Sequence, residues 1–208
     1  MADNDTTVSE TTGMEAVLAF WFDELDEAGM CSSQQQKLWF NPPAGTDETV
    51  LARFGGLIED ALADRLEAWA DSPRGLIALV ILLDQFTRNI YRGTPAAFSG
   101  DRQALELSRL AVAREWQNAM PTIHQVFLYI PFEHAEDLAA QDEGLACFDV
   151  LLNTCEASAR QRVNDFRRYL VAHREVIARF GRFPHRNEIL GRTSTPEELA
   201  YLEKHGGF

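Results

Sequence analysis

A run of apolar residues from Leu76 to Leu83 constrains the fold of this chain more than any other segment. Ser72 and Pro73 form an N-cap and first-turn pair before the run, and Gly93 follows as a C-terminal cap, so the spacing predicts a helix from Pro73 to about Arg92. A helix that is apolar on every side belongs at the centre of a fold. The run is much shorter than the roughly 20 apolar residues that cross a bilayer, so we expect no membrane association.

Hydrophobic periodicity predicts helices through almost all of the remaining chain. Apolar residues recur at three- and four-residue steps, and capping residues mark several of the starts. No alternating strand pattern of useful length is present. We therefore expect an all-α fold built from antiparallel helix pairs. The further predicted helices are one opened by a capping box at Thr12, Ser33 to Phe40, Thr46 to Ala70, Asp101 to Trp116, Thr122 to Gln141 with a kink or break at Pro131, Glu143 to Cys155, Ala157 to Phe180, and a last one opened by a capping box at Thr195.

The length of 208 residues suits a single domain. Residues 1–13 are polar and acidic and lack the basic start and apolar run of a secretory signal, so we expect a flexible tail there and one all-α domain over residues 14–208. The three cysteines, Cys31, Cys147 and Cys155, are odd in number and widely spaced. That usage predicts free thiols in a reducing compartment, and hence a cytoplasmic protein.

The charge of the chain is strongly acidic, with 19 basic residues against 32 acidic ones and a formal net charge of −13. Nucleic acids and anionic membranes bind basic surfaces, so this composition argues against both as partners. The basic minority is nearly all arginine, a side chain suited to fixed, bidentate pairing. Arginines are concentrated between Arg160 and Arg192, where they outnumber the acidic residues.

A polar stripe crosses the predicted central helix. Asp84 follows a long run of glycine and apolar residues, so we expect it to be buried and to need a partner. Arg88 lies one turn along the same face and Arg92 one turn further, with Asn89 beside Arg88. The stripe could form part of a ligand site, or it could be an internal ion pair that ties the helices together.

Carboxylates and a histidine cluster at helical spacing just after Pro131. Glu133, His134 and Glu136 could act as an acid–base set or bind a metal. The paired Glu-x-x-His repeats of carboxylate-bridged di-metal bundles and the His-Glu-x-x-His motif of zinc helices are both missing. We therefore expect no metal and no cofactor, and the carboxylates could instead pair with arginines elsewhere in the chain.

A third polar segment lies on a predicted loop near the C-terminus. Arg182, His185 and Arg186 are placed there by a glycine and a proline, and loop residues on rigid scaffolds often carry function. The Arg186–Asn187 step repeats the Arg88–Asn89 step of the central helix. If the repeat reflects pseudo-symmetry, two Arg-Asn corners meet around one pocket; the alternatives are chance and a solvated run of surface charge.

Long motifs spread over nearly the whole chain after the tail resemble one bacterial family. They are residues 82–94, 129–137 and 179–192, together with Phe20 to Phe22 and the pair Trp39–Phe40. These motifs resemble the family catalogued as domain of unknown function 924. The resemblance implies an all-α fold similar to tetratricopeptide-repeat superhelices, and it implies no reaction, cofactor, substrate or catalytic residue. The sequence departs from the family pattern at Thr87, where we expect proline; a helix continues more easily through threonine.

The leading interpretation of these patterns is a binding module for a small anionic molecule or a peptide carboxylate, because the concave faces of helical repeats commonly serve recognition. Arginines would grip the anion, asparagines would orient it, and histidines would add pH-sensitive hydrogen bonds. The predicted ligand-binding residues are Asp84, Arg88, Asn89, Arg92, Glu133, His134, Glu136, Arg182, His185, Arg186 and Asn187.

Two other interpretations remain open at the level of sequence. One is a hydrolase or lyase that uses His134 or His185 with Glu133 or Glu136 as acid and base, although no nucleophile elbow, phosphate-binding loop or dinucleotide fingerprint is present. The other is a polar network that only stabilises the fold. The aromatic first helix could also pack against a second copy of the chain in a homodimer.

Overall fold

The computed structural model describes residues 3–207, and of residues 3–12 it describes the backbone alone. Helices make up this part of the chain, and the sole β-type pairing within it is an isolated bridge between Leu25 and Cys31. The α-helices are α1 (Asp3–Phe22), α2 (Ser33–Phe40), α3 (Thr46–Leu62), α4 (Pro73–Val80), α5 (Thr87–Ile90), α6 (Asp101–Ala113), α7 (Thr122–His134), α8 (Leu138–Thr154), α9 (Ala157–Phe180) and α10 (Pro196–His205). The short η elements are η1 (Glu67–Asp71), η2 (Ile81–Phe86), η3 (Pro95–Phe98), η4 (Trp116–Ala119) and η5 (Pro184–Arg186).

The predicted central helix is confirmed. Helix α4, the segment η2 and α5 follow one another without a break, and the apolar run at their centre is buried. The Ser72 hydroxyl accepts a hydrogen bond from the Gly75 amide at 3.1 Å, as an N-cap does. Gly93 takes a left-handed φ of 77° just beyond the end. The η2 segment is a π-helical turn, which the periodicity did not predict.

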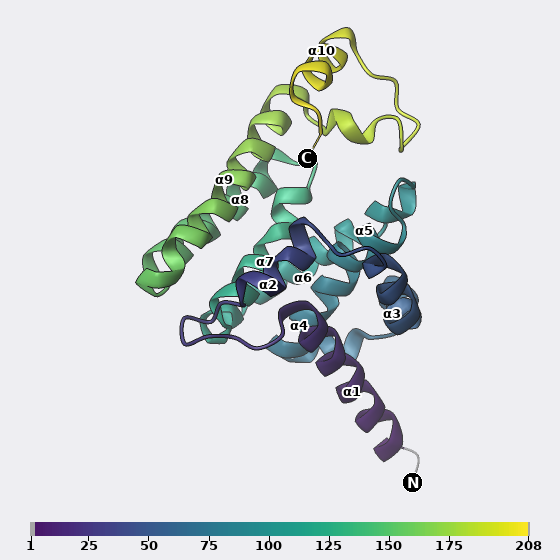
Figure 1. Ribbon diagram of the computed structural model, residues 1–208, viewed down its shortest axis with the longest axis vertical. Helices are drawn as coiled ribbons and strands as arrows, with labels where there is room; N and C mark the ends of the chain where they lie inside the picture. The colour runs from purple at the N-terminus through teal and green to yellow at the C-terminus, as the bar shows by residue number, and fades with distance from the viewer. Residues whose placement is uncertain (1–2, 208) are drawn as a thin grey trace.

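An aromatic core surrounds this central helix. Phe86 of η2 lies 5.4 Å from Trp21 of α1 and 5.0 Å from Phe54 of α3, measured between ring centroids. Phe127 of α7 joins the same cluster, 5.7 Å from Trp21. Edge-to-face and tilted ring pairs of this kind stabilise a core beyond the area that they bury. Helices α1, α3 and α7 are thereby held around the central one (Figure 1).

Helices α8 and α9 form a long antiparallel hairpin, joined by Cys155 and Glu156 (Figure 1). Helix α7 packs against both. After α9 the chain turns at Gly181, where φ is 69°, into a C-terminal segment of residues 181–207 that ends in α10. This segment shares a small apolar cluster with the end of α9, in which Phe183 is fully buried against Val176 and Ile177.

Two predicted helix boundaries are wrong for identifiable reasons. Helix α3 ends at Leu62 and does not continue to Ala70, because Asp64 adopts a left-handed φ of 57° and the chain re-forms as the 3₁₀ turn η1. The expected Asp101–Trp116 helix ends at Ala113, before a left-handed Glu115. Such residues stop a helix much as a C-terminal glycine does.

The helix predicted to run to Gln141 ends earlier, at His134, and it passes through Pro131. The Gln141 side-chain amide donates to the carbonyl of Glu133 at 2.6 Å and to that of Ala135 at 2.9 Å, which satisfies carbonyls at the helix end. Asp137 then caps α8, so this helix begins at Leu138 rather than at Glu143.

Both termini carry helices. Helix α1 begins at Asp3, so its predicted start at the Thr12 capping box is wrong; the expected division into a tail and a domain at residue 13 stays a prediction. At the other end, the predicted capping box between Thr195 and Glu198 is confirmed. Across the described residues, every helix is too short or too polar to traverse a lipid bilayer. The three cysteines are free thiols.

Candidate functional site

The candidate site is built around Asp84, which lies in the π-helical turn η2 and is fully buried. One oxygen, Oδ1, lies 2.7 Å from His134 Nδ1 and 3.2 Å from Arg88 Nη1. The other, Oδ2, accepts a hydrogen bond from the Gln85 amide. A π-helical turn shifts the side-chain positions of a helix, and such turns occur often at functional sites. The predicted Asp84–Arg88 pair is therefore confirmed, with a histidine added to it.

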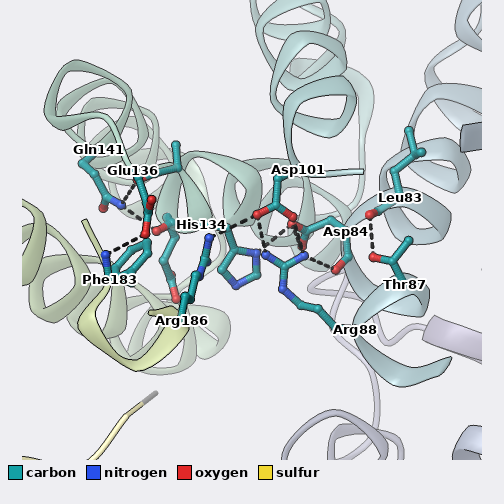
Figure 2. A network of polar contacts seen from close by, with 12 residues as sticks. Leu83, Asp84, Thr87, Arg88, Asp101, His134, Glu136, Gln141, Phe183 and Arg186 are labelled. Atoms are coloured by element: carbon teal, nitrogen blue, oxygen red, sulfur yellow. Dashed lines mark hydrogen bonds and ion pairs between the residues drawn. The ribbon is translucent and has the colours of Figure 1, made fainter. Parts of the chain in front are cut away.

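Asp101 joins two arginines from distant parts of the chain (Figure 2). Its carboxylate lies 2.8 Å from Arg88 Nη1 and 3.3 Å from Arg186 Nη1. Both guanidinium groups also lie over the ring of Phe98, at 5.7 Å for Arg88 and 4.6 Å for Arg186. The structure thus brings the arginines of the two repeated Arg-Asn steps to one carboxylate, but the two asparagines bind other residues, so a pocket between two Arg-Asn corners stays a prediction.

Charge and burial set the protonation of Asp84 and His134 in opposite ways. Burial alone would raise the pKa of Asp84, but the Arg88 guanidinium and then His134 more than offset this and hold that pKa well below its usual range. The pKa of His134 is lowered, chiefly by burial and next by Arg88, although Asp84 acts against both. At neutral pH the pair is therefore a carboxylate bonded to a neutral imidazole.

Glu133 is a buried acid that stays protonated at neutral pH. Burial, reinforced by the charge of Asp84, raises the pKa of Glu133 to about 8. Its Oε1 lies 3.2 Å from Nδ1 of His173, whose pKa burial lowers to about 3. The short distance alone would suggest an ion pair, but both groups are neutral near pH 7, so the contact is a neutral one.

A cavity of about 180 Å³ opens beside these groups. One side of it is polar and is formed by Gln85, Arg88, Glu133 and His134. The other side is apolar, and its lining residues are Trp39, Phe40, Phe127, Ile130, Phe166 and Tyr169. An apolar pocket with a few convergent polar groups and shifted pKa values is the usual form of a small-molecule site. The volume is below the roughly 300–1,000 Å³ of drug-sized sites, so it suits a compact molecule.

Larger hollows, of about 220, 490, 600 and 670 Å³, lie elsewhere on the described surface. None of these hollows is lined by a histidine. The hollows with the largest volumes therefore lie away from the buried titratable groups, and volume alone does not identify the candidate site. We take the smaller cavity beside His134 as the candidate site because it combines buried titratable groups with an apolar wall.

The remaining residues of the central stripe point elsewhere. Asn89 donates to Asp47 of α3 at 2.8 Å, and Arg92 pairs with the same carboxylate at 3.2 Å. Arg92 is largely exposed at this pair. Neither residue lines the cavity, so the structure does not bring them to the candidate site.

The predicted residues of the C-terminal segment form a separate network of polar contacts. Glu136 accepts from the Phe183 amide and pairs with Arg192, which also donates to Asn187. Arg182 forms two hydrogen bonds with the carboxylate of Glu198, at 2.6 and 2.8 Å. Burial, and then Arg186, lowers the pKa of His185 to about 4. None of Glu136, Arg182, His185, Arg186 and Asn187 lines the cavity.

Several site residues were missed by the sequence analysis. Asp101 begins α6, where an acidic residue in the first helical turn is common and indicates no site. His173 lies within the arginine-rich helix α9, which does not distinguish it either. The aromatic wall comes from α2, α7 and α9, where such residues are also expected in a core. The resemblance to the family included the Trp39–Phe40 pair. That match was the one sequence signal that could have identified the aromatic side of the cavity.

Comparisons with known proteins agree on the family of this chain. A family model described as a bacterial protein of unknown function, DUF924, matches residues 17–206. The solved structure of a protein of unknown function from Agrobacterium tumefaciens is 32% identical, with a TM-score of 0.75, and the match covers 93% of this chain and 98% of that one. No curated protein matches the sequence significantly. The cluster around Asp84 lies within the matched residues.

Proposed function

The chain belongs to the DUF924 family of bacterial proteins of unknown function, which assigns it no activity, and from this premise we propose that it binds a compact small molecule in the cavity beside His134. The ligand has an apolar body and an uncharged head that carries oxygen. Ring and aliphatic carbons of the body pack against the aromatic wall, and the head lies against Glu133 and His134.

The division of the cavity lining into an apolar side and a polar side carries this proposal. The apolar side comes from α2, α7 and α9, and the polar side comes from η2, α5 and the end of α7. Burial of an aromatic or branched group against such a wall contributes about 25 cal/mol for each Å² of apolar surface removed from water. The polar side then selects the head group.

The charge balance of the site supports an uncharged head. Asp84 and Asp101 already balance Arg88 and Arg186, since each arginine pairs with at least one of these carboxylates. Glu133 is a neutral acid that can donate a hydrogen bond to a carbonyl or hydroxyl oxygen. Gln85 uses its amide nitrogen on Asp84, which leaves its carbonyl oxygen as an acceptor.

The pairing of the other arginines weakens the anion-binding interpretation of the sequence. Arg92, Arg182 and Arg192 each pair with a carboxylate outside the cavity, on Asp47, Glu198 and Glu136. An anion at the cavity would have to compete with Asp84 and Asp101 for Arg88. The anion interpretation stays a prediction, and the experiment below compares it directly with the uncharged ligand.

The test uses three probes that share a phenyl ring and differ in the head: phenylacetone, phenylacetate and phenyl phosphate. We expect phenylacetone to raise the melting temperature, because a ligand at 100 times its dissociation constant stabilises the fold by about 2.7 kcal/mol. We expect phenyl phosphate to have no effect. Stabilisation by the two anions without any by phenylacetone would reject the uncharged ligand and favour the anion interpretation.

A cavity-filling variant locates the binding. Ile130→Phe adds side-chain volume at the apolar wall and leaves the charged groups unchanged. We expect it to abolish stabilisation by phenylacetone. The matched control is Leu107→Phe, which enlarges a side chain at a different hollow of about 220 Å³. Circular dichroism checks that both variants fold, and equal binding by Ile130→Phe and the wild type would place the ligand elsewhere.

A further inference from the structure

Resting on the proposed function, we propose that the cavity catalyses proton transfer at the carbon next to a carbonyl group of its ligand. His134 Nε2 removes the proton from that carbon, and Glu133 delivers a proton to the carbonyl oxygen. The electron pair of the C–H bond becomes the C=C bond of an enol, and the π pair of the C=O bond takes up the proton from Glu133. Return of a proton from His134 to the same carbon, with return of the enol O–H proton to Glu133, exchanges the hydrogen and restores both groups, so no co-reactant is needed.

The contact between His134 and Asp84 places the base. The 2.7 Å hydrogen bond from Nδ1 to the buried carboxylate fixes the ring and holds its proton on Nδ1 (Figure 2). The lone pair is then on Nε2, at the far side of a ring that lines the cavity. A carboxylate that orients a histidine in this way is a positioning group, and it stabilises the imidazolium once the proton has moved.

Glu133 supplies the acid at the same cavity. It precedes His134 on the last turn of α7, and both side chains line the cavity. Its carboxyl group is protonated at neutral pH, because burial and Asp84 raise its pKa to about 8. A base that is free and an acid that is protonated at the same pH are the states that general acid–base catalysis requires.

An opposite charge lies near each group after the transfer, although Arg88 acts against the His134 imidazolium and Asp84 acts against the Glu133 carboxylate. Imidazolium at His134 lies against the Asp84 carboxylate, and the charge left on Glu133 is stabilised by Arg88, which already lowers the pKa of that acid in part. His173 Nδ1 also lies 3.2 Å from Glu133 Oε1, but it donates its hydrogen bond to the Tyr169 carbonyl at 2.9 Å.

The surroundings of His134 determine how the reaction depends on pH. The titratable and charged groups that face it are Asp84 and Arg88 from the central helix, Glu133 from α7, Asp101 from α6, His173 from α9, and His185 from the C-terminal segment. His173 and His185 have pKa values lowered to about 3 and about 4, chiefly by burial, so they stay neutral through the working range. The wild-type rate therefore reports His134 on the acid side and Glu133 on the alkaline side.

The test measures exchange of the protons next to the carbonyl of phenylacetone in D₂O by NMR, with binding of phenylacetone measured on the same samples. We expect exchange about 100-fold faster than in buffer, in line with general acid–base catalysis. We also expect the wild-type rate to rise as His134 loses its proton and to fall as the pH passes about 8, where Glu133 ionises. This pH profile needs no variant.

Variants assign the roles. His134→Gln and Glu133→Gln should reduce exchange to nearly the buffer rate, while His205→Gln, a change at an exposed histidine on α10, should not alter it. Phenylacetone that binds without faster exchange would overturn proton transfer and leave the proposed function standing. Absence of binding would overturn both. Wild-type exchange by His134→Gln would also overturn the assignment.

Discussion

Asp84 and Glu133 are buried carboxyl groups beside the same arginine, yet at neutral pH Asp84 is ionised and Glu133 is protonated. Asp84 contacts Arg88 and His134 directly, and those contacts keep its pKa well below the usual range even though burial acts to raise it. For Glu133, burial and the charge of Asp84 raise the pKa by more than Arg88 lowers it, so the pKa rises to about 8. Direct contact with a cation thus decides which acid ionises.

This difference predicts a pH-dependent stability that belongs to Glu133. The folded pKa of about 8 lies above the ordinary value of 4.5, so the stabilising effect is complete at low pH and is lost as the pH rises through 8. Between pH 7 and 8.5 we expect the wild type to lose about 1 kcal/mol of unfolding free energy relative to Glu133→Gln. Urea unfolding at each pH measures it.

The control for this prediction is Glu203→Gln, which removes an exposed carboxylate. Its free energy of unfolding should follow that of the wild type over the same pH range. If Glu133→Gln does so too, Glu133 is ionised in the folded protein and its role as an acid is wrong.

At the scale of elements, a close approach of backbones holds the π-helical turn against α6. A Cβ atom added at Gly100 would lie 2.2 Å from the carbonyl oxygen of Leu83, a distance that forces one backbone to move. Gly100 directly precedes Asp101, so the same approach sets the carboxylate above Arg88. The glycine is needed here for space, since its φ of −91° is open to any residue.

Two glycine substitutions therefore have opposite expected effects. Gly100→Ala should destabilise the fold by about 1–3 kcal/mol, as overpacking does. Gly56→Ala, at an exposed site of α3 with nothing within 4 Å of the added Cβ, should stabilise it by about 0.5–1 kcal/mol. Thermal unfolding of both variants measures the effects, and a neutral result for Gly100→Ala would contradict the close approach.

The C-terminal segment is held by polar contacts as well as by its small apolar cluster. The carboxylate of Glu198 is buried and accepts hydrogen bonds from Arg182, Asn187 and the Thr195 amide. The hydrogen bond from Arg182, with those from Thr195 and Asn187, lowers the pKa of Glu198 to about 2. The stability that this group contributes is therefore present above its ordinary pKa of 4.5 and is lost as the pH falls through 2.

Loss of Arg182 tests this arrangement. Arg182→Ala leaves a buried carboxylate without its cation, and we expect it to lower the free energy of unfolding by more than the control below and to speed hydrogen exchange of the α10 amides. Arg102→Ala is the matched control, because its pair with Glu106 is exposed, and it should cost about 0.5 kcal/mol or less. Unchanged stability and exchange in Arg182→Ala would show that the apolar cluster alone holds the segment.

At the scale of the whole molecule, three histidines besides His134 stay neutral at pH 7: His124 and His173, which are buried, and His185, which is partly buried. Burial is the main cause in each, and it lowers the pKa to about 4 for His124, about 3 for His173 and about 4 for His185. In the unfolded chain each takes up a proton near the ordinary value of 6.5. The unfolded state therefore binds more protons than the folded state below that pH, and acid favours unfolding.

We expect the free energy of unfolding to fall by about 2 kcal/mol between pH 6.5 and 5.5. The three histidines, with His134 acting in the same direction, outweigh Glu133, whose effect over this range has the opposite sign. Urea unfolding at constant ionic strength measures the change. A flat profile would mean that the histidines titrate normally in the folded protein.

How far the candidate site could be predicted depends on the range of each contact. The Asp84–Arg88 pair follows from one helical turn, so the sequence was enough to predict it. The bond between Asp84 and His134 joins residues 50 positions apart, and the one between Asp101 and Arg186 spans 85. No local pattern encodes such a contact, because it depends on how helices pack against one another.

By itself, the sequence determined the helical class, the burial of the central helix, and the charged stripe on it, because periodicity and capping act over one or two turns. The predicted tetratricopeptide-like superhelix stays a prediction. Only the tertiary structure decided which carboxylates the arginines pair with and which histidine meets Asp84. The physical reason is that packing of many side chains sets the distances between helices, and a difference of a few ångströms there decides whether an acid holds its proton.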